Sequence, residues 1–210
     1  MKVVAQDGYQ RQPVNGLVRV LFCAQRHPPK EHPPPAKSMA RKRILEILSS
    51  CDHEGTWQQC TLLAAGLPPD EWDVQFCLLS NNRNSLQPLK ETRLPVHVAG
   101  DCRRNDLLAL WPLIRLVKNL QPDIIHSWNS SANRYGSLAA TICGTKTIFC
   151  NTSNVIRSQK LWNLCVDRLW TKRITKLIVP SRAVFNSVDS LAQIPKEKLV
   201  LIPPAVPLTL

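Results

Sequence analysis

Polar side chains that could bind a hydroxylated ligand follow several apolar stretches of this 210-residue chain. His126 and Asn129 come after the stretch at residues 123–125, and Asn151 follows residues 146–150. A histidine beside amide side chains can hydrogen-bond substrate hydroxyls, or accept a proton near neutral pH. The alternative is a histidine whose ring is satisfied by the local backbone, and the sequence leaves both interpretations open.

A second candidate lies at residues 49–56, between an apolar stretch and a helical pattern. Gly55 at the start of this helix could bring backbone N–H groups close to an anion or a sugar hydroxyl. One glycine is not a G-x-G-x-x-G pattern, so a dinucleotide site is not predicted. An ordinary loop in which Thr56 caps the helix explains the same residues equally well.

Metal and covalent chemistry find little support. No two of the eight cysteines lie two to four residues apart, and the five histidines form no paired ligand spacing with them, so neither a metal site nor a cofactor is predicted. Cysteines within apolar stretches are typical of core packing in a reducing compartment. Ser153 has no neighbouring His, Asp or Glu to activate it, and no catalytic nucleophile is assigned.

A parallel sheet is the element that would bring these candidates together. Short apolar runs alternate with longer helical patterns along most of the chain. The expected strands are 44–48, 74–79, 95–98, 123–126, 146–150, 177–179 and 199–202, and the expected helices are 56–67, 105–120, 131–143, 158–172 and 182–191. Unbroken apolar strands separated by helices indicate an α/β fold, a Rossmann-like three-layer parallel sheet of six or seven strands. Such sheets bind ligands at the carboxyl ends of their strands, where the candidates lie.

The N-terminal part differs in composition from the rest. Six of the 17 prolines fall before residue 40, which predicts a basic, Pro-rich, disordered leader over residues 1–40 ahead of a domain over residues 41–206. Met39 is followed by Ala-Arg-Lys-Arg and then by the first strand. Our hypothesis is that Met39, rather than Met1, is the true start.

The formal net charge of +12 includes a local excess of cations at residues 157–176, where six basic side chains face one acidic one. The basic residues are Arg157, Lys160, Arg168, Lys172, Arg173 and Lys176. With Trp162 and Trp170 among them, this segment suits a helix lying on an anionic membrane surface. The alternative is a solvated helix whose cations flank a core-facing stripe. A nucleic-acid partner is not expected, because no recognition motif or aromatic stacking platform is present.

The longest apolar run, residues 107–114, is too short to span a membrane, and no secretory signal is present. The sequence therefore predicts a cytoplasmic protein.

Several motifs, in order and spacing, resemble the acceptor domain of family 4 (group 1) glycosyltransferases, which are retaining enzymes of GT-B fold. They are Gln-Pro-Asp-Ile-Ile-His at 121–126, Tyr-Gly-Ser-Leu-Ala-Ala at 135–140, Gly-Thr-Lys at 144–146, Ile-Val-Pro-Ser-Arg-Ala-Val at 178–184 and Ile-Pro-Lys-Glu-Lys-Leu-Val-Leu-Ile-Pro at 194–203. The resemblance covers residues 42–206. It implies one half of a GT-B fold, with residues 207–210 at the start of an interdomain linker.

The resemblance also implies a function. A glycosyltransferase of hexosyltransferase type would move a sugar from a nucleotide-sugar donor to a glycan or lipid-linked acceptor. The basic segment at 157–176 would place it peripherally at the inner face of the membrane. Gly55, Thr56, His126, Asn129 and Asn151 would line the acceptor cleft. The nucleotide sugar would bind only with a second domain, so this chain would be a fragment or a split subunit. The alternative function is a catalytically silent module of the same fold that binds a glycan or a partner.

Overall fold

The computed structural model describes residues 40–51, 54–81, 83–100, 110–152, 171–191 and 194–205, all within the unit Pro34–Leu210. The predicted leader, apart from residue 40, and the predicted linker at residues 207–210 lie outside these ranges. So does most of the predicted helix at 158–172, of which only residues 171–172 are described, both in helical conformation.

Strands and helices alternate along the described chain, as the sequence predicts. The strands are β1 (Lys42–Leu48), β2 (Trp72–Leu78), β3 (Val96–Val98), β4 (Ile124–Ser127), β5 (Thr147–Asn151), β6 (Lys176–Val179) and β7 (Leu199–Leu201). The helices are α2 (Glu54–Gly66), α3 (Arg83–Lys90), α4 (Leu110–Leu120), α5 (Ser130–Cys143) and α7 (Arg182–Leu191), with a short 3-10 turn at Lys196–Lys198. No helix in these ranges is long and apolar enough to cross a bilayer.

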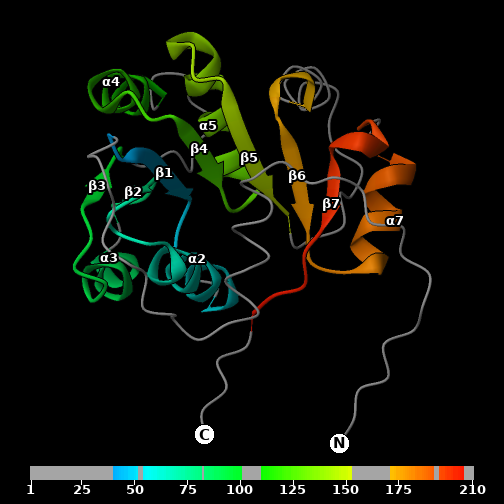
Figure 1. Cartoon of the computed structure of the whole chain (residues 1–210), viewed down its shortest axis with the longest axis horizontal. Helices are drawn as coiled ribbons and strands as arrows, with labels where there is room; N and C mark the ends of the chain where they lie inside the picture. Colours follow the sequence, from blue (N-terminus) through cyan, green and yellow to red (C-terminus); the bar gives the residue numbers. More distant parts are fainter. Residues whose placement is uncertain are drawn as a thin grey trace, which may run out of the picture. The chain divides into compact units, whose positions relative to one another are not determined.

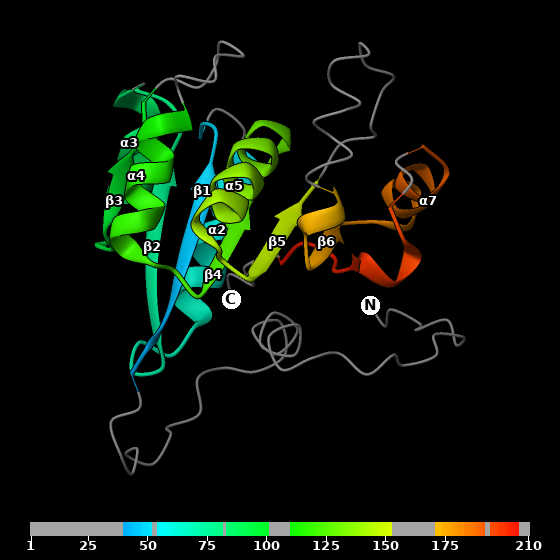
Figure 2. The same cartoon turned by 90° about the horizontal axis from the view of Figure 1, so that it is seen from above.

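The seven strands form one parallel sheet in the order β3-β2-β1-β4-β5-β6-β7. Figure 1 shows α4 and α5 on one side of the strands and α2 and α3 on the other, and Figure 2 shows α4 and α5 side by side. The expected Rossmann-like three-layer architecture is confirmed. Since the strand order runs outward from β1 to β3 and restarts at β4, the topological switch point lies between β1 and β4.

Alternate strand residues build the main core on the α4–α5 side of the sheet. Ile47, Ile125 and Leu177 are fully buried there with helix residues of α4, α5 and α7. Cys77 and Cys150 belong to the same core, which confirms that these thiols pack as small hydrophobes. Burial raises the pKa of the Cys150 thiol to about 12, so it stays protonated at neutral pH.

Helix α5 lies unusually close to the sheet because Gly136 has no side chain. A Cβ atom at this position would lie 2.5 Å from Ser127 Oγ and 3.1 Å from Ile47 Cδ1. The helix ends, as expected, at Gly144, whose φ of 79° is the left-handed conformation that favours glycine.

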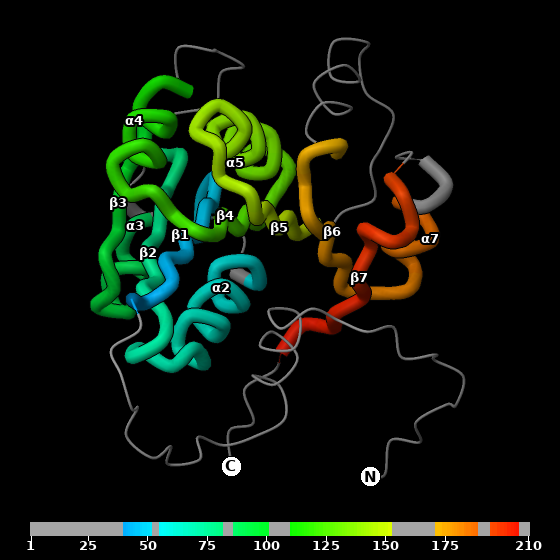
Figure 3. The backbone as a smooth tube through the Cα atoms, turned by 45° about the horizontal axis from the view of Figure 1, so that its top comes forward, coloured from blue at the N-terminus to red at the C-terminus, as the bar shows by residue number. Residues whose placement is uncertain are grey.

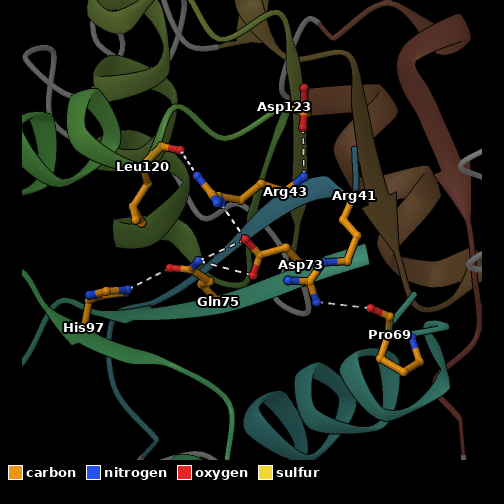
Figure 4. Close-up of polar contacts among 8 residues, drawn as sticks. All are labelled: Arg41, Arg43, Pro69, Asp73, Gln75, His97, Leu120 and Asp123. Carbon is orange, nitrogen blue, oxygen red and sulfur yellow. Dashed lines mark hydrogen bonds and ion pairs between the residues drawn. The ribbon is translucent and has the colours of Figure 1, made fainter. Parts of the chain in front are cut away.

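A polar network at the amino ends of β1, β2 and β3 joins the sheet to α4 (Figure 4). Arg43 Nε donates to Asp73 Oδ2 at 2.6 Å, and Nη1 donates to the carbonyl oxygen of Leu120 at the end of α4. Gln75 Nε2 donates to both carboxylate oxygens of Asp73 at 3.2 Å, and its Oε1 lies 2.9 Å from His97 Nε2. Since burial lowers the pKa of His97, the neutral ring with a proton on Nε2 fits this contact.

One helix differs from the expectations. Helix α3 was not predicted, because its sequence is polar and contains Pro88, yet Leu89 is fully buried. Of the predicted helix at 105–120, residues 110–120 are described and are helical, while residues 105–109 lie outside the described ranges.

We expect Gly136→Ala to lower the free energy of unfolding by about 1–3 kcal/mol, because the added methyl group overlaps Ser127 Oγ. Gly55→Ala is the matched control, since a Cβ there meets nothing within 4 Å. Urea unfolding of both variants checks the prediction. Equal midpoints for the two variants would show that α5 can move away from the sheet without loss.

We expect Asp73→Asn to cost about 1 kcal/mol at pH 7, because the ion pair with Arg43 is partly exposed. Burial favours a higher pKa for Asp73, but hydrogen bonds from Arg43 and Gln75 outweigh it and hold the pKa below its ordinary value. A carboxyl group whose pKa is lower in the folded than in the unfolded chain stabilises the fold at every pH above its unfolded pKa. This stabilisation is lost as the pH falls through the pKa of the folded state. The variant should therefore lose less stability than the wild type below about pH 4. Parallel loss in both proteins would contradict this assignment.

Candidate functional site

A carboxylate and an imidazole face each other across the switch point of the sheet. Glu46 in β1 is paired in register with His126 in β4, and the Glu46 Oε2 atom lies 3.0 Å from His126 Nδ1. Both side chains are buried, Glu46 completely. The protonated ring makes an ion pair with the carboxylate, while the neutral ring donates from Nδ1–H. In either state the carboxylate fixes the orientation of the ring.

Two further donors lie against the same oxygen of this carboxylate. Trp128, directly after β4, donates from Nε1 to Glu46 Oε2 at 2.5 Å, and Cys60 Sγ on α2 lies 3.7 Å from the same oxygen. Burial and the negative charge of Glu46 raise the pKa of the Cys60 thiol well above its ordinary value. The thiol therefore remains a protonated donor, and α2 is seated on the cluster formed by Glu46, Cys60, His126 and Trp128.

Hydrophobic side chains surround this cluster. Phe76 and Phe149 are the register neighbours of Glu46 and His126 on β2 and β5. Among the described residues, Glu46 Oε1 and His126 Nε2 have no hydrogen-bond partner. Two buried polar atoms thus retain bonding capacity next to the carboxyl edge of the sheet, where ligands bind in this class of fold.

The predicted residues Gly55 and Thr56 lie in the first turn of α2, just after the carboxyl end of β1. Thr56 is the third residue of the helix, so the interpretation of Thr56 as the helix cap is wrong. The helix already begins at Glu54, two residues earlier. Gly55 is exposed and Thr56 is half-buried, so both can be reached from the carboxyl edge.

Asn129 and Asn151 lie at the same edge, at the start of α5 and the end of β5. The Asn129 side chain caps α5 by accepting a hydrogen bond from Ala132 N at 3.1 Å. Asn133, one turn into α5, is buried and donates from Nδ2 to the carbonyl oxygen of Asn151 at 3.1 Å. This bond connects the start of α5 to the end of β5. It uses the backbone carbonyl of Asn151, whose side chain is half-buried.

The structure therefore divides the five predicted residues into two groups. Gly55, Thr56, Asn129 and Asn151 lie at the carboxyl edge, whereas the His126 ring is buried and its Nδ1 atom is paired with a side chain rather than with the local backbone. Sequence reasoning missed Glu46. The available signal was one charged residue in the otherwise apolar run Ile-Leu-Glu-Ile-Leu. Within the described ranges, no three His, Cys, Asp or Glu side chains are grouped to hold a metal ion.

We expect Glu46→Ala to cost about 3–5 kcal/mol, because it leaves buried donors of His126 and Trp128 without an acceptor. Glu46→Gln keeps an acceptor oxygen and should cost less. Urea unfolding at pH 7 measures both, with exposed Glu91→Gln as the control. An alanine variant as stable as the control would show that the carboxylate does not hold this cluster together.

Comparison with solved structures gives the same fold at low sequence identity. HepE of Anabaena, solved in complex with UDP, aligns with a TM-score of 0.64 and 16% identity over 77% of this chain and 44% of its own. A glycosyltransferase from Rickettsia africae aligns with a TM-score of 0.60 and 14% identity, over 79% of this chain and 43% of its own. The UDP-GlcNAc 2-epimerase of Neisseria meningitidis, bound to UDP-GlcNAc, aligns with a TM-score of 0.57 and 15% identity, over 76% of this chain and 46% of its own.

This chain thus spans less than half the length of these solved proteins and has the fold of one half of a GT-B protein. No curated protein matches it in sequence. The model of the family described as Glycosyltransferase Family 4 matches residues 54–210, which include every predicted site residue. The chain belongs to Glycosyltransferase Family 4.

Proposed function

We propose that this chain is the acceptor-side half of a glycosyltransferase of hexosyltransferase type. It would take part in transferring a sugar from a nucleotide-sugar donor to a glycan or lipid-linked acceptor. Membership of Glycosyltransferase Family 4 is the observation that carries the proposal. The polar groups at the switch point of the sheet support it, because this is where α/β sheets bind their ligands.

In this proposal the acceptor lies against the carboxyl edge, between the first turn of α2 and the ends of β4 and β5. Gly55 and Thr56 offer backbone N–H groups and a hydroxyl, and Asn129 and Asn151 offer amides. Such neutral groups suit the hydroxyls of a sugar. The Nε2 atom of the buried His126 ring has no partner among the described residues, so it is the ring atom that we propose meets an acceptor hydroxyl.

The nucleotide-sugar donor would be bound together with a second domain. HepE of Anabaena was solved with UDP-glucose, and this chain aligns with 43% of it. The proposed division of labour gives the acceptor to this half and most donor contacts to the other.

The test measures acceptor binding and sugar transfer with a panel of UDP-sugars, with and without candidate partner subunits. Asn151→Ala should weaken acceptor binding about tenfold, as expected for one lost hydrogen bond. Its backbone bond from Asn133 is kept, so stability should not change. Exposed Asn119→Ala, at the far end of α4, is the control. Equal acceptor affinity for the two variants would contradict the placement of the acceptor.

The alternative function is a catalytically silent module that binds a glycan or a partner. It is favoured by the state of Glu46, a carboxylate that is buried at the switch point and engaged by three donors rather than open to a substrate. Saturable acceptor binding without transfer under any condition would support the module. Transfer by the chain, alone or with a partner, would support the enzyme.

We also propose contact with an anionic surface at the inner face of the membrane, through the basic residues of 157–176. Lys172 and Arg173 are exposed, as this requires, whereas Lys176 Nζ donates to the carbonyl oxygen of Glu197 at 2.6 Å. Arg157, Lys160 and Arg168 lie outside the described ranges. Binding to vesicles with anionic lipid should weaken steeply with salt, and Lys172→Gln/Arg173→Gln should bind more weakly and with a shallower salt dependence. Salt-insensitive or absent binding would contradict this proposal.

A further inference from the structure

The segment after β7 turns back toward α2, as the red trace shows in Figures 1 and 3. Ile202 N still donates to the carbonyl oxygen of Val179 in β6 at 3.0 Å, which continues the β7 register. Pro203 and Pro204 follow, and neither has a backbone N–H. Ala205 is therefore the next residue that can donate a backbone hydrogen bond.

One side chain of α2 satisfies both backbone groups of Ala205. Ala205 N donates to Gln59 Oε1 at 2.7 Å, and Gln59 Nε2 donates to the carbonyl oxygen of Ala205 at 2.6 Å. A glutamine amide presents the same donor and acceptor pair as a peptide unit. Gln59 thus pairs with Ala205 as a neighbouring strand would, and it holds the backbone rather than any particular side chain.

The path between these two attachments is stiff. Each proline ring fixes its own φ, so residues 203 and 204 have little freedom between the bond at β6 and the bond at α2. β6 and α2 are separated in the sheet by β5 and β4, because α2 follows β1. The segment must therefore pass beside the carboxyl ends of β5 and β4, at the edge of the proposed acceptor site.

Gln59 also lies where α2 meets the rest of that site. It is one helical turn after Gly55, so both residues share a face of the helix. The next residue, Cys60, points inward and contacts Glu46. The same turn of α2 is thus fixed on one side to the buried carboxylate and on the other to Ala205.

We propose that Gln59 is a positioning residue that latches the segment after β7 onto α2 and makes residues 203–205 one wall of the acceptor site. The latch sets the course on which the chain leaves the sheet. The attachment of Ala205 by Gln59 does not depend on the proposed function. The role of residues 203–205 as a wall of the acceptor site rests on the proposed function.

Hydrogen exchange at the Ala205 amide tests the latch directly. Because the two prolines have no amide hydrogen, Ala205 is the one backbone reporter between Ile202 and residue 206. Gln59→Ala should speed its exchange about tenfold, the factor that one net hydrogen bond provides. Gln59→Glu keeps the acceptor for Ala205 N but loses the donor to its carbonyl, so it should fall between wild type and alanine. The neighbouring exposed Gln58→Ala is the matched control.

Amides of β1 and the unfolding midpoint show whether each variant is folded. If Ala205 exchanges at the same rate in Gln59→Ala and Gln58→Ala, the latch is wrong. Acceptor affinity tests the wall, and Gln59→Ala should weaken it while Gln58→Ala does not. If Gln59→Ala speeds exchange at Ala205 but leaves acceptor affinity unchanged, residues 203–205 do not form a wall of the acceptor site, although Gln59 still holds Ala205. A wild type that binds no acceptor would overturn the proposed function, and exchange at Ala205 alone would then decide the latch.

Discussion

A carboxylate without access to water must find its hydrogen bonds inside the protein, because an unpaired buried charge is among the costliest groups in a folded chain. Glu46 meets this constraint at the centre of the sheet through Oε2, while its Oε1 atom has no partner among the described residues. His126 and Trp128 reach it from the β4 side, and Cys60 reaches it from α2. Oε2 of Glu46 therefore links α2 to β1 and β4, which the backbone ladder already holds in register. The polar groups proposed to bind the acceptor begin just beyond these elements.

The two faces of the sheet solve the packing problem differently. On the α4–α5 face the core is apolar, and Gly136 brings α5 close enough for van der Waals contact with Ile47 and Ser127. On the α2 face the centre is polar, with Phe76 and Phe149 beside it. A non-directional apolar core fixes the spacing of the layers, whereas the directional bonds around Glu46 fix orientation. Orientation is what a ligand-binding edge requires.

Most of the architecture could be predicted from the sequence. Unbroken apolar runs such as residues 177–179 identify buried parallel strands, and Gly144 marks the end of α5. The polar helix α3 could not be predicted, since its burial rests on few apolar contacts such as Leu89. The sequence predicts where the candidate residues lie along the chain, but not which side chains they bind. Strand ends locate Asn129 and Asn151, but nothing in the sequence says that Asn133 binds the Asn151 carbonyl, or that His126 pairs with a glutamate 80 residues earlier. Such pairs depend on strand register, which is a property of the assembled sheet.

The buried thiols have a consequence for following how this domain opens. Cys60 lies on α2 and points toward the sheet, while Cys77 and Cys150 lie under the opposite helical layer, and all three are buried thiols outside any disulfide. A thiol reagent can modify each of them only after its own layer has separated from the sheet. Modification rates read by peptide mass would thus distinguish loosening of the carboxylate side from loosening of the apolar side, with the natural sequence serving as its own set of probes.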